Sequence, residues 1–120
     1  MDIQNKSREL KKDVIIAIAI FITALLIRGV YLYESSDNPT FKFPIVDSAT
    51  YDETAIALIE ANYIDSNIFW QPVFYPLFIA LLYALSNTSI IFVKIVQSLI
   101  GCFVCVLTYI VGKKIFDRFR

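Results

Sequence analysis

Two long stretches of apolar residues dominate the chain, one towards each end. The first, Val14–Tyr33, has about 20 residues and a single charge, Arg28, and a helix of that length crosses a bilayer at about 1.5 Å per residue. The second, Ile90–Gly112, has about 23 residues with Lys94 as its only charge, and it is also long enough to span. The pattern therefore predicts two transmembrane helices.

Between these stretches the pattern is polar and broken. Ser35–Pro44 contains two prolines and predicts a loop. Apolar residues then recur at helical spacing, which predicts a helix near residues 47–62. Val73–Leu85 has about 13 residues, a length more typical of an interfacial or buried helix than of a span. Ser86–Ser89 separates this segment from the second long stretch.

The sign of the charge differs between the ends and the middle of the chain. Between Gly29 and Ser66, acidic residues outnumber basic ones seven to one. Basic residues collect instead at the two ends: Lys6, Arg8, Lys11, Lys12, Lys113, Lys114, Arg118 and Arg120. Because positive charge marks the cytoplasmic side of a membrane protein, both termini are expected in the cytoplasm.

The favoured fold class is therefore an all-α integral membrane protein with two transmembrane helices joined by an extracytoplasmic loop. Its segments are a cytoplasmic N-terminus 1–13, a transmembrane helix 14–33, a loop 34–89 with interfacial helices near 47–62 and 73–85, a transmembrane helix 90–112 and a cytoplasmic tail 113–120. A third span over 73–85 ranks second, because it would place Lys113 and Lys114 outside. A cleavable signal peptide is disfavoured, because no small-x-small cleavage pattern follows Ile27.

The composition limits the chemistry. Hydrophobic residues make up 58% of the chain and charged residues 18%, which is more apolar than an ordinary soluble domain. The formal net charge is zero, so no nucleic-acid partner is expected. There is no histidine, so any acid–base chemistry falls to carboxylates.

The most informative motif is Asp47-Ser-Ala-Thr-Tyr51-Asp-Glu-Thr-Ala55, at the start of the predicted loop helix. Residues four apart share a helix face, so the carboxylate of Asp47 lies at the N-terminal tip of a face that includes Tyr51 and Ala55. Two interpretations of Asp47 stay open, a helix N-cap and a catalytic carboxylate. A capping box of Thr50 with Glu53 is an alternative start of the helix.

The other charged residues have both structural and functional interpretations. Arg28 is placed either to meet a lipid phosphate through charge-assisted hydrogen bonds or simply to reach the headgroup level. Asp52 and Glu53 are interpreted as a solvated helix face. For Lys94, near the outer end of the second span, reaching the headgroups is a sufficient explanation.

The aromatic and cysteine residues favour structural roles. The aromatic residues of Phe69–Phe78 are typical of the belt that forms at a membrane interface. Cys102 and Cys105 match a C-x-x-C motif, but they lie within a span and lack a second pair. They are interpreted as small residues packed between helices.

Three motifs occur in a recognisable order: Arg-x-x-Tyr-Leu from Arg28, Asp-Ser-x-x-Tyr-x-x-x-Ala from Asp47, and aromatic-Gln-x-x-x-Tyr-Pro-Leu-Phe from Trp70. This order resembles the start of the polytopic glycosyltransferases with the GT-C fold. The closest resemblance is to the dolichyl- or polyprenyl-phosphate-mannose protein mannosyltransferase-like family, and it extends from about Ala24 to Phe116. Such enzymes are several times longer, so the chain resembles an N-terminal fragment, and the remainder of the transferase is an expected partner.

The resemblance implies transfer of a sugar from a polyprenyl-phosphate donor, a membrane lipid, to an acceptor hydroxyl. Asp47 is the implied catalytic base or the ligand of a divalent cation. Arg28, Tyr51, Gln71 and Tyr75 are the implied substrate-binding residues. Two alternatives are a non-catalytic two-span protein that binds a partner through its acidic loop, and an anchored surface domain without lipid chemistry.

Overall fold

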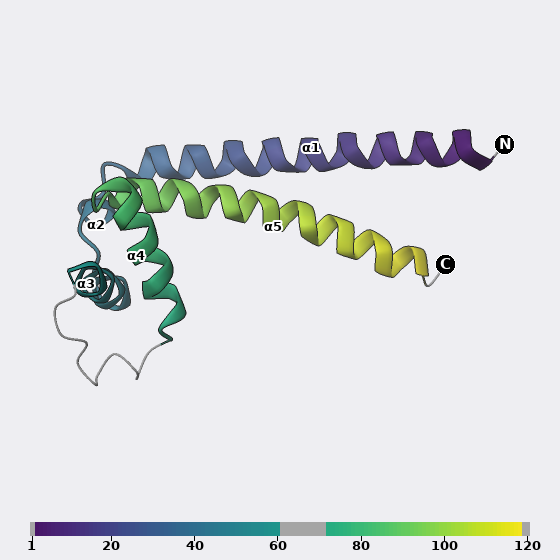
Figure 1. Cartoon of the computed structure of the whole chain (residues 1–120). Coiled ribbons are helices and arrows are strands. Elements are labelled where there is room, and N and C mark those ends of the chain that lie inside the picture. The colour runs from purple at the N-terminus through teal and green to yellow at the C-terminus, as the bar shows by residue number, and fades with distance from the viewer. Residues whose placement is uncertain (1, 61–71, 119–120) are drawn as a thin grey trace. The chain divides into compact units, whose positions relative to one another are not determined.

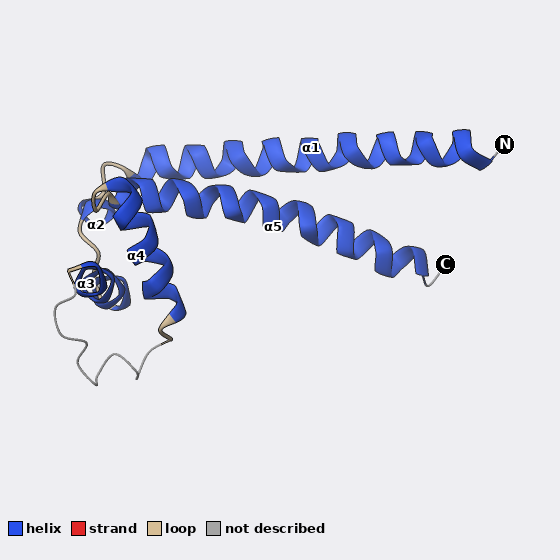
Figure 2. Cartoon of the chain, in the orientation of Figure 1, coloured by secondary structure: helices blue, strands red, loops and turns tan. Residues whose placement is uncertain are grey.

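The computed structural model describes residues 2–60 and 72–118, and within these ranges all regular structure is helical (Figures 1 and 2). The helices in these ranges are α1 Asp2–Ser35, α2 Pro39–Lys42, α3 Asp47–Ile59, α4 Phe74–Ser86 and α5 Ile90–Arg118. The chain divides into two compact units. We call Met1–Leu32 with Gln97–Arg120 the long-helix unit, and Tyr33–Val96 the short-helix unit.

Two helices are long and apolar enough to cross a membrane, Ile3–Ser35 and Ile90–Asp117. The prediction of an all-helical chain with two such helices is therefore confirmed for the described residues. Both helices also extend beyond the predicted spans, because the flanking segments are rich in residues that favour helix, such as Lys, Arg and Glu.

Within the long-helix unit, α1 and α5 lie next to each other at the end far from the chain termini and separate towards the N- and C-termini (Figure 1). The rings of Phe21 and Phe103 meet at a centroid distance of 5.0 Å. Cys102 is completely buried in this contact region, in agreement with a packing role. The outward faces are apolar and open, as Leu26 at 64% exposure and Leu107 at 58% illustrate. A lipid-facing helix pair has this distribution, because apolar side chains need no cover in hydrocarbon.

The short-helix unit has its own small core, formed where α3 packs on α4. Ala55 of α3 has 0% exposure, and its small side chain allows close approach of the two helices. The other buried members of this core are Ile79, Ala80, Leu82, Tyr83 and Val93. Val93 belongs to the first turns of α5, so the start of that helix closes the core.

The helix boundaries confirm part of the prediction. α4 begins and ends within one residue of the predicted 73–85, and α3 begins at the predicted Asp47 but ends at Ile59, short of residue 62. The break predicted at Ser86–Ser89 is confirmed for residues 87–89, whereas Ser86 still belongs to α4. There Asn87 adopts the left-handed conformation that ends α4, and the Ser89 hydroxyl accepts a hydrogen bond from the Phe92 amide at 3.3 Å.

The loop predicted over Ser35–Pro44 is partly wrong, since it contains the short helix α2. Pro39 is the first residue of this helix, where its missing amide hydrogen is no disadvantage. Asn38 provides the N-cap by accepting a hydrogen bond from the Thr40 amide at 3.0 Å. The proline therefore starts a helical turn instead of preventing one.

Candidate functional site

Asp47 is the first residue of α3, and its side chain is exposed. Within residues 2–60 and 72–118, no hydrogen bond or ion pair involves its carboxylate. The carboxylate is therefore open to an external ligand.

The interpretation of Asp47 as an N-cap is wrong. The N-cap position belongs to Val46, which provides no side-chain acceptor and has φ 56°, a backbone conformation unfavourable for a β-branched residue. Because the helix already includes Asp47, its carboxylate is one position too late to cap the first turn. The alternative capping box is not formed either, since the described contacts include no hydrogen bond between Thr50 and Glu53.

Tyr51 and Tyr75 are the two predicted site residues that the structure brings together. Their rings meet edge to face, with centroids 5.0 Å apart and planes at 86°. Tyr51 projects from α3 one turn after Asp47, and Tyr75, in the first turn of α4, is 40% exposed. Edge-to-face contact fixes both rings and adds about 0.5–1.5 kcal/mol beyond the burial of their surface.

Gln71, the remaining loop residue of the predicted site, lies outside the described residues, and so do Phe69 and Trp70 of the aromatic run. No metal site is evident in the described residues, where no three or more carboxylate, thiol or imidazole side chains gather. A divalent cation at Asp47 would therefore find fewer than three such ligands in this part of the chain.

Arg28 lies in the long-helix unit, half-buried against Gly101 of α5. A Cβ atom at position 101 would lie 2.5 Å from the Arg28 Nη2 atom and 2.6 Å from its Nε atom. The guanidinium group thus occupies the space that a side chain at 101 would need. Sequence reasoning did not single out Gly101 for this contact, although small residues at helix interfaces are a known signal of close approach.

Arg28 also lies at one end of a groove of about 470 Å³ along α1. The other residues that line this groove are apolar or small: Ile16, Ala19, Ile20, Thr23, Ala24, Ile27 and Cys105. An apolar groove with a cation at one end has the chemistry to hold a lipid chain that carries a phosphate.

Asp52 is not the solvated residue that the sequence predicted. Its carboxylate accepts a hydrogen bond from the hydroxyl of Tyr83, which projects from α4 and is only 3% exposed. Burial and this hydrogen bond both raise the pKa of Tyr83 above its usual value. A tyrosine in an otherwise apolar helix was the available signal, because a buried phenol needs a partner.

Lys94 also has a partner within the protein. The interpretation that its side chain simply reaches the lipid headgroups therefore does not describe its contacts. Its ammonium donates to the carbonyl oxygen of Phe41 at 2.6 Å and lies 3.6 Å from the centre of the Phe41 ring. Phe41 is 8% exposed, so α2 is held against the start of α5 by a hydrogen bond and a cation–π contact.

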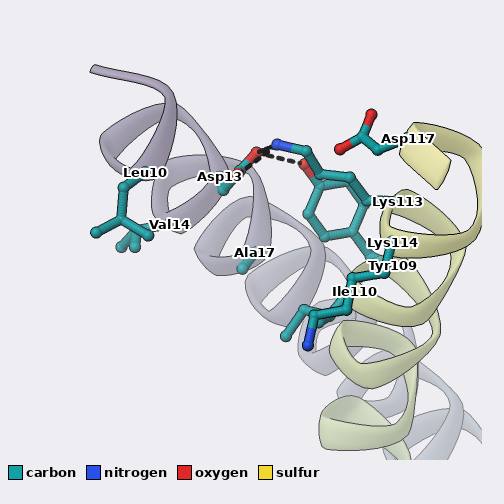
Figure 3. A pocket seen from close by; sticks show the side chains of 9 residues that line it. All are labelled: Leu10, Asp13, Val14, Ala17, Tyr109, Ile110, Lys113, Lys114 and Asp117. Atoms are coloured by element: carbon teal, nitrogen blue, oxygen red, sulfur yellow. Dashed lines mark hydrogen bonds and ion pairs between the residues drawn. The ribbon is translucent and has the colours of Figure 1, made fainter. Parts of the chain in front are cut away.

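A third polar contact, also missed from the sequence, joins α1 to α5 near the chain ends. Asp13 of α1 forms an ion pair with Lys113 and accepts a hydrogen bond from the Tyr109 hydroxyl at 3.2 Å (Figure 3). We call these three residues the Asp13 clasp. The hydrogen bond from Lys113 lowers the pKa of Asp13, and the same contact raises the pKa of Lys113.

No family model, curated protein or solved structure matches the chain. The described residues of this chain carry two candidate sites. These provide an open carboxylate beside an aromatic pair in the short-helix unit, and a guanidinium at the end of an apolar groove in the long-helix unit.

Proposed function

We propose that the chain is an integral membrane protein of the cell membrane that spans the bilayer twice, with both termini in the cytoplasm. The two long apolar helices support this topology, as does the concentration of basic residues at both ends. On this topology α3 and α4 lie outside, where α4 is too short to cross and remains at the interface.

We further propose that the chain is the N-terminal part of a glycosyltransferase that moves a sugar from a polyprenyl phosphate to an acceptor hydroxyl. The observation that carries this proposal is the contrast between two neighbouring carboxylates. Asp52 accepts a hydrogen bond from Tyr83, whereas Asp47 has no partner among the described residues. A general base needs a free carboxylate within reach of the acceptor, and Asp47 meets the first condition.

In this mechanism Asp47 takes the proton of the acceptor hydroxyl as the oxygen attacks the anomeric carbon. The bond from that carbon to the phosphate oxygen breaks, and the polyprenyl phosphate leaves with the electron pair. The donor carries its own leaving group, so no nucleotide is required. The resemblance implies that Arg28 binds the lipid phosphate, which a guanidinium does by charge-assisted hydrogen bonds, and the groove beside Arg28 has an apolar lining that suits part of a lipid chain.

The rings of Tyr51 and Tyr75 would form the wall of the acceptor site. Tyr51 lies one helical turn after Asp47, its ring contacts that of Tyr75, and a phenol combines an apolar ring with a polar tip. Gln71 would supply a further hydrogen bond to the substrate, as the resemblance implies.

The test is Asp47→Asn in the chain assembled with the remainder of the transferase, with sugar transfer from the polyprenyl-phosphate donor as the readout. We expect turnover to fall by about 100-fold or more, because the amide cannot accept the proton. Glu53→Gln is the matched control, since Glu53 is exposed and neighbours the site. Asp52→Asn is unsuitable, because it would also weaken the contact with Tyr83.

Retained transfer by Asp47→Asn, in protein that inserts normally, would overturn the catalytic role. It would favour the second candidate, a non-catalytic protein whose loop binds a partner. One observation supports that candidate: Phe43, Ile45 and Val46, directly before Asp47, are 74%, 57% and 78% exposed. Exposed apolar residues beside a carboxylate are typical of a contact surface.

A further inference from the structure

A second cavity, of about 470 Å³, lies between the N-terminal part of α1 and the C-terminal part of α5 (Figure 3). Both helices contribute apolar residues to its lining: Leu10, Val14, Ala17 and Ile110. The polar lining consists of the Asp13 clasp together with Lys114 and Asp117. A volume of this size is within the usual range of small-molecule sites, about 300–1,000 Å³.

The charges around this cavity do not all neutralise one another within the protein. Asp13 and Lys113 form the ion pair of the clasp. Lys114 and Asp117 are exposed, and in the described part of the chain neither has a hydrogen bond or an ion pair, although the charge of Asp117 lies close enough to Lys113 to help raise the pKa of that lysine. The cavity therefore presents one available cation and one available anion beside an apolar lining.

The position of the cavity along the helices indicates its surroundings. The predicted spans end at Val14 and Gly112, and the lining residues extend from 10 to 17 on α1 and from 109 to 117 on α5. On the proposed topology the cavity therefore lies at the cytoplasmic interface, where phospholipid headgroups meet acyl chains.

We infer that this cavity binds an inner-leaflet phospholipid whose headgroup carries a phosphate and a primary ammonium. Lys114 pairs with the phosphate, Asp117 accepts hydrogen bonds from the ammonium, and the first part of an acyl chain packs on the apolar lining. A zwitterionic headgroup matches one available cation and one available anion, whereas an anionic headgroup would leave Asp117 unfavourably close to negative charge. This inference rests on the proposed membrane topology and is independent of the transferase chemistry.

The experiment is native mass spectrometry of the full chain in detergent, with equal amounts of phosphatidylethanolamine, phosphatidylcholine and phosphatidylglycerol. We expect phosphatidylethanolamine to be retained about fivefold more than either competitor, on the scale of about 1 kcal/mol for one charge contact at a membrane surface. Phosphatidylcholine has the same net charge, but its quaternary ammonium cannot donate to Asp117. Equal retention of all three lipids, or preference for phosphatidylglycerol, would overturn the inference.

Two variants identify the residues. Lys114→Gln should lower retention of phosphatidylethanolamine about fivefold, and Asp117→Asn should move the preference towards phosphatidylglycerol by removing the repulsion. Lys11→Gln is the control, since it removes a cation of the same terminal region that does not line the cavity. Unchanged binding in Lys114→Gln and Asp117→Asn would also overturn the inference. Loss of sugar transfer alone would not affect it, and cysteine labelling tests the topology separately.

Discussion

The contact between Asp52 and Tyr83 allows a quantitative test of how α3 is held on α4. Tyr83→Phe keeps the buried ring and removes only the hydroxyl that donates to Asp52. A hydrogen bond to a charged group contributes about 1.5–3 kcal/mol. Because Asp52 is partly exposed and can bind a water molecule instead, we expect the variant to lose stability near the lower end of this range, about 1.5 kcal/mol.

Asp52→Ala is the complementary change. It leaves the Tyr83 hydroxyl without its partner at 3% exposure, and an unsatisfied buried donor costs about 1–3 kcal/mol. In the double variant the hydroxyl is absent, so that penalty disappears. The sum of the two single-variant losses of stability should therefore exceed the loss in the double variant by about 1–2 kcal/mol, as expected for residues in direct contact.

Hydrogen–deuterium exchange of the full chain in detergent measures these effects as changes in protection of the α3 and α4 amides. A change of about 1.4 kcal/mol corresponds to tenfold faster exchange where opening is at equilibrium. Glu53→Ala, at an exposed neighbouring position, should change protection by less than about 0.5 kcal/mol. Additive effects of the two single variants would refute the argument, because they would mean that Asp52 and Tyr83 do not interact.

Three further predictions concern the long helices. In a variant without the native cysteines, Asn38→Cys should react with an impermeant thiol reagent from outside and Lys114→Cys only from the cytoplasm, whereas outside labelling at 114 would refute the two-span topology. Either Asp13→Lys or Lys113→Asp should reduce disulfide crosslinking between cysteines introduced at facing positions of α1 and α5, and the double exchange should restore it; failure of that rescue would refute the clasp. Because the folded pKa of Asp13 is lowered, the contribution of the clasp should persist above about pH 4 and disappear as pH falls further, as crosslinking with a pH-insensitive reagent would report.

The sequence was sufficient to predict the elements that local pattern determines. The two long helices, the start of α3 and the extent of α4 depend on apolar runs and on breaks such as Ser86–Ser89. The exceptions are also local: α2 formed because Asn38 caps a turn that starts at proline, and Val46 took an unfavourable conformation that no propensity would suggest.

The polar contacts were mostly missed, because their partners are far apart in the chain. Asp13 and Lys113 are separated by 100 positions, and Lys94 and Phe41 by 53. Periodicity describes which face of a helix is apolar, but not which residue of another helix it meets. For the candidate site, helix spacing correctly placed Tyr51 one turn after Asp47, while the contact of Tyr51 with Tyr75 depends on how α3 and α4 pack.

The contact of Arg28 with Gly101 has a consequence for the alignment of α1 with α5. A movement of α1 along α5 by one helical turn, about 5.4 Å, would carry the guanidinium group away from Gly101. The Asp13 clasp fixes the same pair about 20 Å further along, so the register is set at two levels. A shift of α1 along α5 would therefore have to break both contacts at once.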